Sequence, residues 1–298
     1  MVVCSALAMQ GSQAVAKLAF VMAAPVVVTA LRFAFGAGVL WALWRPRPPS
    51  GRSSVFLVLG LGTALAGASV TIYEAFDRLP LGLAVTLQSL GALLVSLLGA
   101  RRARHVLWAL LAAGGVVLIN YRPGGALSGA GIALALGSAA CWAAYILLSA
   151  RVGARTTGGG ALALASAWAA LLTIPYALVV QPGAFLDVRV LAAGLAVAVL
   201  STVVANSLEL QALRRIPPRA FGVLVSLEPA MAALLGLLVL GERLTPAQWV
   251  ATAVIVTASV GVTLDTADRG SGPGASGGDG VPTPPPRPSA PRRSRSSV

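Results

Sequence analysis

Long apolar runs follow one another along almost the whole chain, and short polar or charged stretches separate them. The runs are continuously apolar and do not alternate with polar residues, so they are typical of membrane helices and not of barrel strands. A helix needs about 20 apolar residues to cross the hydrocarbon core. Cutting the chain at its charges, prolines and glycine clusters predicts ten spans, at residues 2–21, 26–44, 55–76, 81–99, 105–121, 130–149, 161–180, 190–212, 219–240 and 247–264. The predicted fold is an all-α, polytopic membrane protein.

Arginines in the predicted connections lie mostly on one side of the membrane. The connections after even-numbered spans carry eleven arginines, and those after odd-numbered spans carry only four, which are Arg78, Arg122, Arg189 and Arg243. Because basic residues favour the cytoplasmic side, this distribution places the N-terminus in the cytoplasm. After ten spans the C-terminus is cytoplasmic as well.

Composition supports a membrane protein. Of the 298 residues, 57% are hydrophobic and 10% are charged, whereas soluble domains carry roughly 25% charged residues. The net charge is +13, but the basic residues lie between apolar runs and in the C-terminal region, so no compact basic domain could bind nucleic acid. The first span has no basic lead-in, so we expect a true membrane span whose start codon lies upstream, and not a cleaved signal peptide.

The last 33 residues differ from the rest of the chain. Residues 266–298 contain seven prolines and six glycines and no apolar run, which predicts a disordered cytoplasmic tail. Its arginines either contact anionic lipid or dock a specific partner.

An internal repeat divides the chain into two halves. The stretch YEAFDRLP at 73–80 ends the third span, and LQALRRIP at 210–217 ends the eighth. Aligning the two prolines places Glu74 over Gln211 and Arg78 over Arg215. The halves are therefore residues 1–121 and 129–265, with five spans each. Since five is odd, the second half enters the membrane inverted, which is the plan of many secondary transporters.

Ionisable residues inside a membrane are costly, at roughly 3 kcal/mol in the middle of a helix, so each one is a candidate for function. Glu228 lies near the middle of the ninth span and precedes Pro229, which breaks the helical hydrogen bonding there. Glu228 is either a proton or substrate-amine site or a protonated structural residue. Lys17 lies seven residues from Gln10, on the same helix face, and either binds substrate or extends to the interface.

Six further residues are candidates whose role stays open. Arg32, in the second span, is either a gating residue or a structural partner. Gln88 needs a hydrogen-bond partner inside the membrane. The remaining candidates form two pairs, each three residues apart and thus on one face of its span. They are the aromatic pair Trp142 and Tyr145 and the polar pair Asn206 and Glu209.

Enzyme chemistry is excluded by the residues that the chain lacks. The single histidine, His105, lies at a membrane edge beside Arg104, so a histidine-based metal site or a Ser-His pair cannot form. Cys4 and Cys141 both lie in apolar stretches, which argues against a disulfide framework and a zinc site. We therefore expect no metal and no cofactor.

Several stretches resemble the EamA-type drug/metabolite transporters. They are Met9 to Lys17, AAPVVVTALRFAFG at 23–36, SAACWAAYILLSARVG at 138–153, and 200–246, which contains Leu227-Glu228-Pro229 and Gly241-Glu242. Within this family the chain is most similar to the threonine/homoserine exporter branch. The resemblance implies a ten-helix carrier in a bacterial inner membrane that exports small amino acids, by exchange with protons. In the fourth span the related exporters carry a Glu and, four residues later, a Pro, whereas this chain has Gln88 and Ala92.

The mechanism that we predict is alternating access. Glu228 binds either the substrate ammonium or a proton, and Lys17 with Gln10 meets the substrate carboxylate or keeps Glu228 ionised. The alternatives are an exporter of another metabolite or drug, and a membrane scaffold without transport. The sequence gives no indication of oligomeric state.

Overall fold

The computed structural model describes residues 2–46, 51–98, 103–120, 128–153, 160–205 and 226–270. Its elements are helices, in the order α1 (Val2–Ala19), α2 (Pro25–Trp44), α3 (Arg52–Phe76), α4 (Leu81–Leu98), α5 (Ala103–Asn120), α6 (Gly129–Gly153), α7 (Gly160–Val180), the 3-10 turn η1 (Pro182–Leu186), α8 (Val188–Ala198), the π-helical η2 (Val199–Ala205), α11 (Glu228–Leu240) and α12 (Pro246–Gly270). The described residues contain no strand, which confirms the all-α prediction for this part of the chain.

Local sequence explains where several helices begin and end. Proline occupies the first turn of α2 and of α11, where its missing N–H costs no helical hydrogen bond. The Asp187 side chain accepts a hydrogen bond of 2.8 Å from the N–H of Arg189 and so caps α8. α12 runs to Gly270, so the first residues that we predicted to be tail are helical, and residues 271–298 lie outside the described part.

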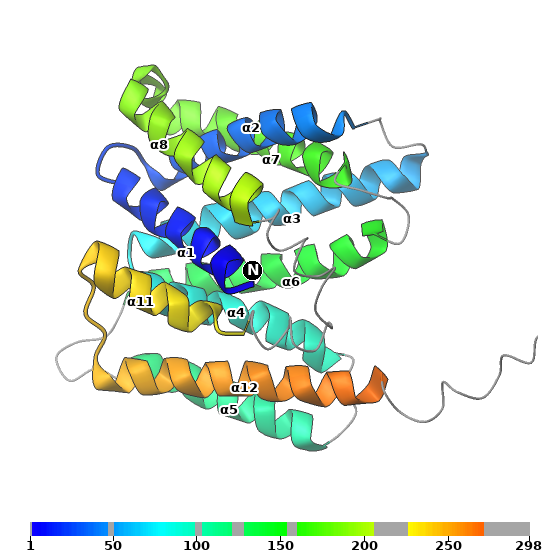
Figure 1. Ribbon diagram of the computed structural model, residues 1–298, viewed down its shortest axis with the longest axis vertical. Coiled ribbons are helices and arrows are strands. Elements are labelled where there is room, and N and C mark those ends of the chain that lie inside the picture. Colours follow the sequence, from blue (N-terminus) through cyan, green and yellow to red (C-terminus); the bar gives the residue numbers. More distant parts are fainter. Residues whose placement is uncertain are drawn as a thin grey trace, which may run out of the picture.

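The helices form a layered bundle (Figure 1). α2 packs along α7, and α3 packs along both α6 and α7. α4 packs on α6 and α11, and α5 pairs with α12 at the bottom of the view. α1 lies against α8, η2 and α11.

Glycine permits the closest of these approaches. A Cβ on Gly82 of α4 would lie 2.5 Å from Cα of Ala233 in α11, and one on Gly62 of α3 would lie 2.5 Å from the carbonyl oxygen of Ala165 in α7. Small residues at helix crossings are typical of membrane bundles, in which packing replaces the hydrophobic effect as the driving force.

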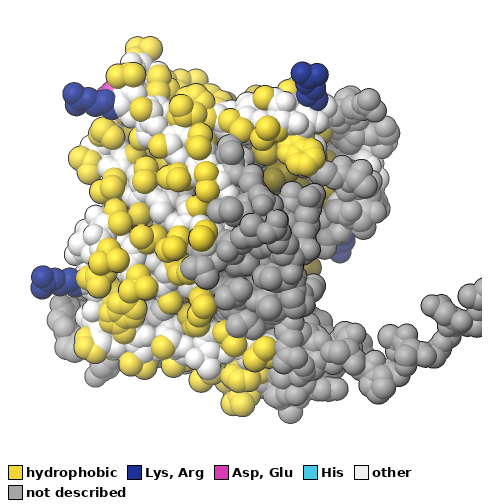
Figure 2. Space-filling model, viewed as in Figure 1, with side chains coloured by type: hydrophobic (Ala, Val, Ile, Leu, Met, Phe, Trp, Pro, Cys, Tyr) yellow, Lys and Arg dark blue, Asp and Glu magenta, His cyan; other side chains and the backbone are white. Residues whose placement is uncertain are grey.

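The surface is apolar over a wide area. Figure 2 shows hydrophobic side chains spread across the middle of one face, with the Lys and Arg side chains at its edges. Leu171, Val179 and Leu238 are among the large apolar side chains that are more than half exposed. Such a surface suits lipid as the solvent, because exposure of so much apolar area to water is unfavourable.

Four of the described helical stretches combine the length and the hydropathy needed to cross a membrane. They are Pro25–Trp44, Arg52–Phe76, Gly129–Ser149 and Gly160–Val180. Shorter apolar stretches lie in α4, in α8 with η2, in α11 and in α12. The chain is thus a helical membrane protein, and the number of ten spans stays a prediction. The second copy of the repeat, at 210–217, lies outside the described residues.

Candidate functional site

Lys17 forms a close ion pair with a carboxylate from the far end of the chain. Its Nζ, near the end of α1, lies 2.6 Å from Oε1 of Glu242 in the α11–α12 connection. The same ammonium donates a hydrogen bond of 2.6 Å to the carbonyl oxygen of Leu79, between α3 and α4. The side chains of Lys17 and Glu242 are only 19% and 15% exposed, so water screens their attraction less than at an open surface.

The Glu242 carboxylate has a second partner at the N-terminus of α4. Oε2 accepts a hydrogen bond of 2.7 Å from the N–H of Leu81, the first residue of that helix. Helix N-termini carry a partial positive charge and unpaired N–H groups, which suit a carboxylate. A Cβ on Gly236 would lie only 2.6 Å from Oε2, so the missing side chain of Gly236 leaves space for the carboxylate.

Backbone geometry carries Glu242 to this position. α11 ends at Gly241, which has a φ of 68° and thus adopts a left-handed conformation that suits glycine. The next N–H, that of Glu242, donates a hydrogen bond of 2.9 Å to the carbonyl of Gly236. α12 then begins with a capping box, because the Thr245 N–H donates to Oε1 of Gln248 at 2.9 Å and the Gln248 N–H donates to Oγ1 of Thr245 at 3.3 Å.

A neutral side chain makes another link at the same end of the bundle. Gln181, directly after α7, accepts a hydrogen bond of 2.8 Å from the N–H of Ala24 and donates one of 3.5 Å to the carbonyl of Met22. We call this end of the bundle, at the left of Figure 1, the Lys17 end. It is defined by Lys17, Ala24, Leu79, Gln181 and Glu242.

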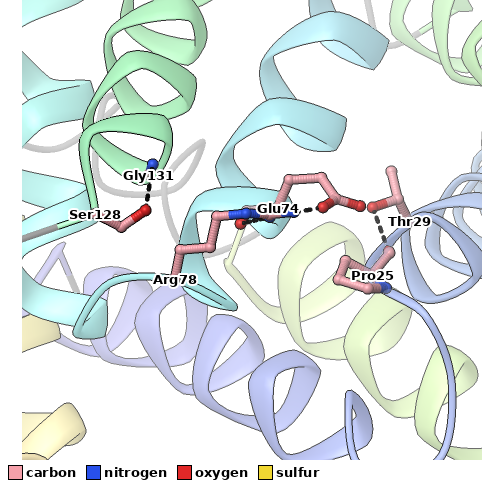
Figure 3. A network of polar contacts seen from close by, with 6 residues as sticks. All are labelled: Pro25, Thr29, Glu74, Arg78, Ser128 and Gly131. Atoms are coloured by element: carbon pink, nitrogen blue, oxygen red, sulfur yellow. Dashed lines mark hydrogen bonds and ion pairs between the residues drawn. The ribbon is translucent and has the colours of Figure 1, made fainter.

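A second ion pair at the Lys17 end stays within one segment. Nη1 of Arg78 lies 2.8 Å from Oε2 of Glu74, four residues earlier. Figure 3 shows the Arg78 side chain lying back toward Glu74, near separate local contacts of Thr29 with Pro25 and of Ser128 with Gly131. The Glu74 and Arg78 side chains are 25% and 37% exposed, so this pair is the more solvated one.

Gln10 lies deeper along α1 and is completely buried. Neither its Oε1 nor its Nε2 has a hydrogen-bond partner among the described residues, and the same holds for Oε1 of Gln13. An unsatisfied buried amide costs roughly 1–3 kcal/mol, so such a group is unusual without a role. Since Gln10 and Lys17 are seven residues apart, they share a face of α1.

Arg32 is a cation in a membrane helix whose described partner is a phenol. Its Nη1 donates 3.2 Å to the hydroxyl of Tyr73, and its guanidinium carbon lies 5.8 Å from the centre of the Tyr73 ring. The Tyr73 ring is fully buried and lies 5.8 Å from that of Phe20. Within the described ranges, no carboxylate lies at ion-pair distance from Arg32.

Gln88 finds the partner that its position requires. Its Nε2 donates 2.8 Å to Oγ of Ser138 in α6, and that hydroxyl donates 2.8 Å to the carbonyl of Ala68 in α3. The contact joins three helices by neutral polar groups at mid-length. The amide of Gln88 is accommodated in α4 because it has a hydrogen-bond partner in Ser138, and the Ser138 hydroxyl has its own acceptor in the Ala68 carbonyl.

The remaining candidates stand in different surroundings. Trp142 and Tyr145 stack, with ring centres 4.9 Å apart, and pack against a hydrophobic cluster that includes Phe33. Glu228 is half-buried at the first residue of α11, with Pro229 beside it in the first turn, and not in the middle of a described helix. Asn206 and Glu209 lie outside the described residues.

The structure thus brings together Lys17 with Glu242, Arg32 with Tyr73, and Gln88 with Ser138. Sequence reasoning missed Glu242 as a candidate. Glu242 could have been noticed as part of Gly241-Glu242, in the stretch that carries the family resemblance. The sequence does not indicate which cation its carboxylate would contact. In the part of the chain that is described, no three His, Cys, Asp or Glu residues gather as metal ligands would.

Comparison with known proteins adds the family. The model of the EamA-like transporter family matches residues 129–264. The threonine/homoserine exporter RhtA of Escherichia coli strain K12 is 40% identical over 258 residues, which cover 86% of this chain and 87% of that protein. The chain belongs to the EamA-like transporter family.

A further relative agrees with this assignment. The threonine/homoserine exporter RhtA of Salmonella typhimurium strain LT2 is also 40% identical over 258 residues, with the same coverage. A crystal structure of a protein with 24% sequence identity superposes with a TM-score of 0.61, over 91% of this chain and 98% of the other. That likeness shows a shared fold over 91% of this chain.

Proposed function

We propose that this protein is a secondary transporter of a bacterial inner membrane that exports small amino acids of the threonine and homoserine type, in exchange for protons. The observation that carries the proposal is the 40% identity to threonine/homoserine exporters over 86% of the chain. The polar groups inside the helical bundle support it, because a carrier for a charged, hydrogen-bonding solute needs such groups at membrane depth.

Helix packing supports two inverted halves, residues 1–121 and 129–265. If α1 to α5 correspond in order to α6, α7, α8, α11 and α12, several of the contacts fall into matched pairs. α3 packs on α6 as α8 packs on α1, α4 packs on α6 as α11 packs on α1, and α3 packs on α7 as α8 packs on α2. The contacts α2–α7, α4–α11 and α5–α12 join corresponding helices. A two-fold axis in the membrane plane would produce this pattern.

The arginine distribution orients these halves. It favours cytoplasmic N- and C-termini, so the Lys17 end of the bundle would face the outside. Rocking of the two halves would then expose a central site alternately to either side, as in other inverted-repeat transporters.

The substrate site in this mechanism lies where α1 meets α11. Gln10 supplies a buried amide that a polar solute can satisfy, and α1 packs against the helix that starts at Glu228. We propose that Glu228 binds the substrate ammonium and a proton in turn. Competition of two cations for one carboxylate couples their opposed fluxes, because the site cannot carry both at once.

The test is efflux of labelled threonine and homoserine from proteoliposomes, with and without an imposed pH gradient. Wild type should show gradient-stimulated efflux, and Glu228→Gln should lose the stimulation, because its side chain cannot exchange a proton. Glu74→Gln is the matched control, since that carboxylate is paired within its own segment. Efflux by Glu228→Gln at the wild-type rate over the whole pH range would contradict the coupling role.

Two rivals are separated by the same assay. If folded wild type exports neither amino acid, the EamA-like carrier exports another metabolite or drug. A non-transporting scaffold that acts through its C-terminal tail would lose its function on deletion of 271–298, whereas a carrier would keep its efflux.

A further inference from the structure

We propose that Glu242 is a gating residue, whose carboxylate closes the Lys17 end of the bundle and leaves both of its partners when that end opens. The inference rests on the proposed alternating access. It assigns a role to a residue outside the predicted substrate site and gives Lys17 a partner other than the substrate.

The contacts of Glu242 join the two proposed halves. Glu242 belongs to the second half, and both of its side-chain partners belong to the first. Oε1 lies 2.6 Å from the Lys17 ammonium on α1, and Oε2 accepts 2.7 Å from the Leu81 N–H on α4. One carboxylate therefore ties two helices of one half to the other half.

The electrostatics make this tie strong and still reversible. Both hydrogen bonds involve a charged group and are of the short, stronger kind. The two side chains are 19% and 15% exposed, so water reaches them and can solvate each charge after separation. Separation of a fully buried pair would cost much more, because each charge would be left with neither a partner nor water.

Position also favours a gate over a simple brace. Lys17 is near the end of α1, Leu81 begins α4, and Glu242 follows α11, so all three lie where a tilt between the halves produces the largest displacement. Glu242 rests over Gly236, where an added Cβ would lie 2.6 Å from Oε2. Because Gly236 has no side chain, no bulky group packs against the carboxylate from that side, and its contacts with Lys17 and Leu81 keep it in place. A change of the Glu242 side-chain rotamer is enough to separate the carboxylate from both partners, so that the halves can then tilt apart.

The experiment measures access to the bundle interior from outside. In a Cys4→Ser, Cys141→Ser background, Gln10→Cys places a reporter thiol at a fully buried position. Right-side-out vesicles are treated with a charged, membrane-impermeant methanethiosulfonate reagent, and the labelling rate is followed by mass. Glu242→Gln should raise this rate about tenfold, which corresponds to a shift of about 1.4 kcal/mol toward the open state.

Three companion variants keep the proposal falsifiable. Glu74→Gln, which breaks a pair within one segment at the same end, should leave the rate unchanged. Gly236→Ala keeps both charges but displaces the carboxylate, so it should raise the rate even if Glu242→Gln folds poorly. The double variant Lys17→Glu with Glu242→Lys restores an ion pair with reversed charges, so its labelling rate should lie between those of Glu242→Gln and wild type. Recovery should be incomplete, because a cation does not suit the N-terminus of α4.

Unchanged labelling in folded Glu242→Gln and Gly236→Ala would overturn the gate, as would an equal rise in Glu74→Gln. The assay needs neither substrate nor gradient. Failure of the proposed function would appear as absent efflux of threonine and homoserine by wild type, whereas failure of the gate would leave wild-type efflux intact and labelling unaltered.

Discussion

Two ion pairs at the same end of the bundle use the same chemistry for different structural tasks. Glu74 and Arg78 are four residues apart, whereas Lys17 and Glu242 stand at opposite ends of the helical part of the chain. The local pair is 25% and 37% exposed, and the long-range pair is 15% and 19% exposed. The long-range pair also includes backbone groups of Leu79 and Leu81 in its contacts.

The difference teaches that sequence separation and burial decide what an ion pair does. A pair four residues apart, such as Glu74 in α3 with Arg78 in the turn after it, depends on local geometry and contributes little. A pair between distant segments exists only in the folded arrangement, so it can distinguish one arrangement of the halves from another. The predictions below test this contrast, in addition to the Glu228 and Glu242 experiments.

The largest effect is expected from removing one charge of the long-range pair. Lys17→Met leaves Glu242 partly buried without its cation, and should lower the free energy of unfolding by about 2 kcal/mol. Arg78→Met should cost no more than about 0.5 kcal/mol, since exposed i,i+4 pairs contribute about that much. Unfolding in mixed micelles, followed by circular dichroism, measures both. Equal losses in the two variants would remove the distinction between the pairs.

A smaller effect is expected from moving the carboxylate without changing any charge. Gly236→Ala brings a Cβ within 2.6 Å of Oε2 of Glu242, and the flexible side chain can retreat only by leaving its partners. We expect a loss of about 1 kcal/mol, the usual contribution of a hydrogen bond. Gly11→Ala is the control, because no atom lies within 4 Å of its added Cβ. The contrast fails if the control loses as much stability in the same unfolding assay.

The smallest effect is expected for neutral hydrogen bonds, where a contact between helices is compared with one inside a single segment. Ser138→Ala breaks the contacts that join Gln88 to the carbonyl of Ala68, across three helices. Its cost should be about 0.6 kcal/mol, which is typical of interhelical hydrogen bonds in membranes. Ser201 is equally buried, but its hydroxyl donates 2.7 Å to Val197 of its own segment. Ser201→Ala should therefore cost less, and a larger cost for Ser201→Ala in the unfolding assay would reverse the ranking.

Local pattern was enough to predict most of the helices that the structure describes. The predicted segment 26–44 corresponds to α2, and 161–180 corresponds to α7, because continuous apolar runs ended by charges, prolines or glycines specify helices of membrane length. The least accurate boundaries were the start of α11, predicted at 219 and found at Glu228, and the end of α12, which continues to Gly270 past the composition change at 266. Helix ends of this kind depend on a few residues, whose propensities differ by only fractions of a kcal/mol.

The candidate site was only partly predictable, because its residues are polar groups whose partners lie far away in sequence. Lys17, Gln10 and Gln88 stood out since each is a polar residue in an apolar run. Glu242 did not, because it lies in a connection, where a charged residue needs no explanation.

The sequence by itself determined the helical membrane class and the family, because hydropathy and motif spacing are properties of local stretches, and arginine placement predicts an orientation in the same way. Only the tertiary structure decided that Lys17 pairs with Glu242, that Arg32 meets Tyr73, and that Gln10 is buried without a described partner. Such contacts depend on how helices cross, and crossing is set by close packing at residues such as Gly82, summed over the whole bundle. No local stretch of the chain contains that information.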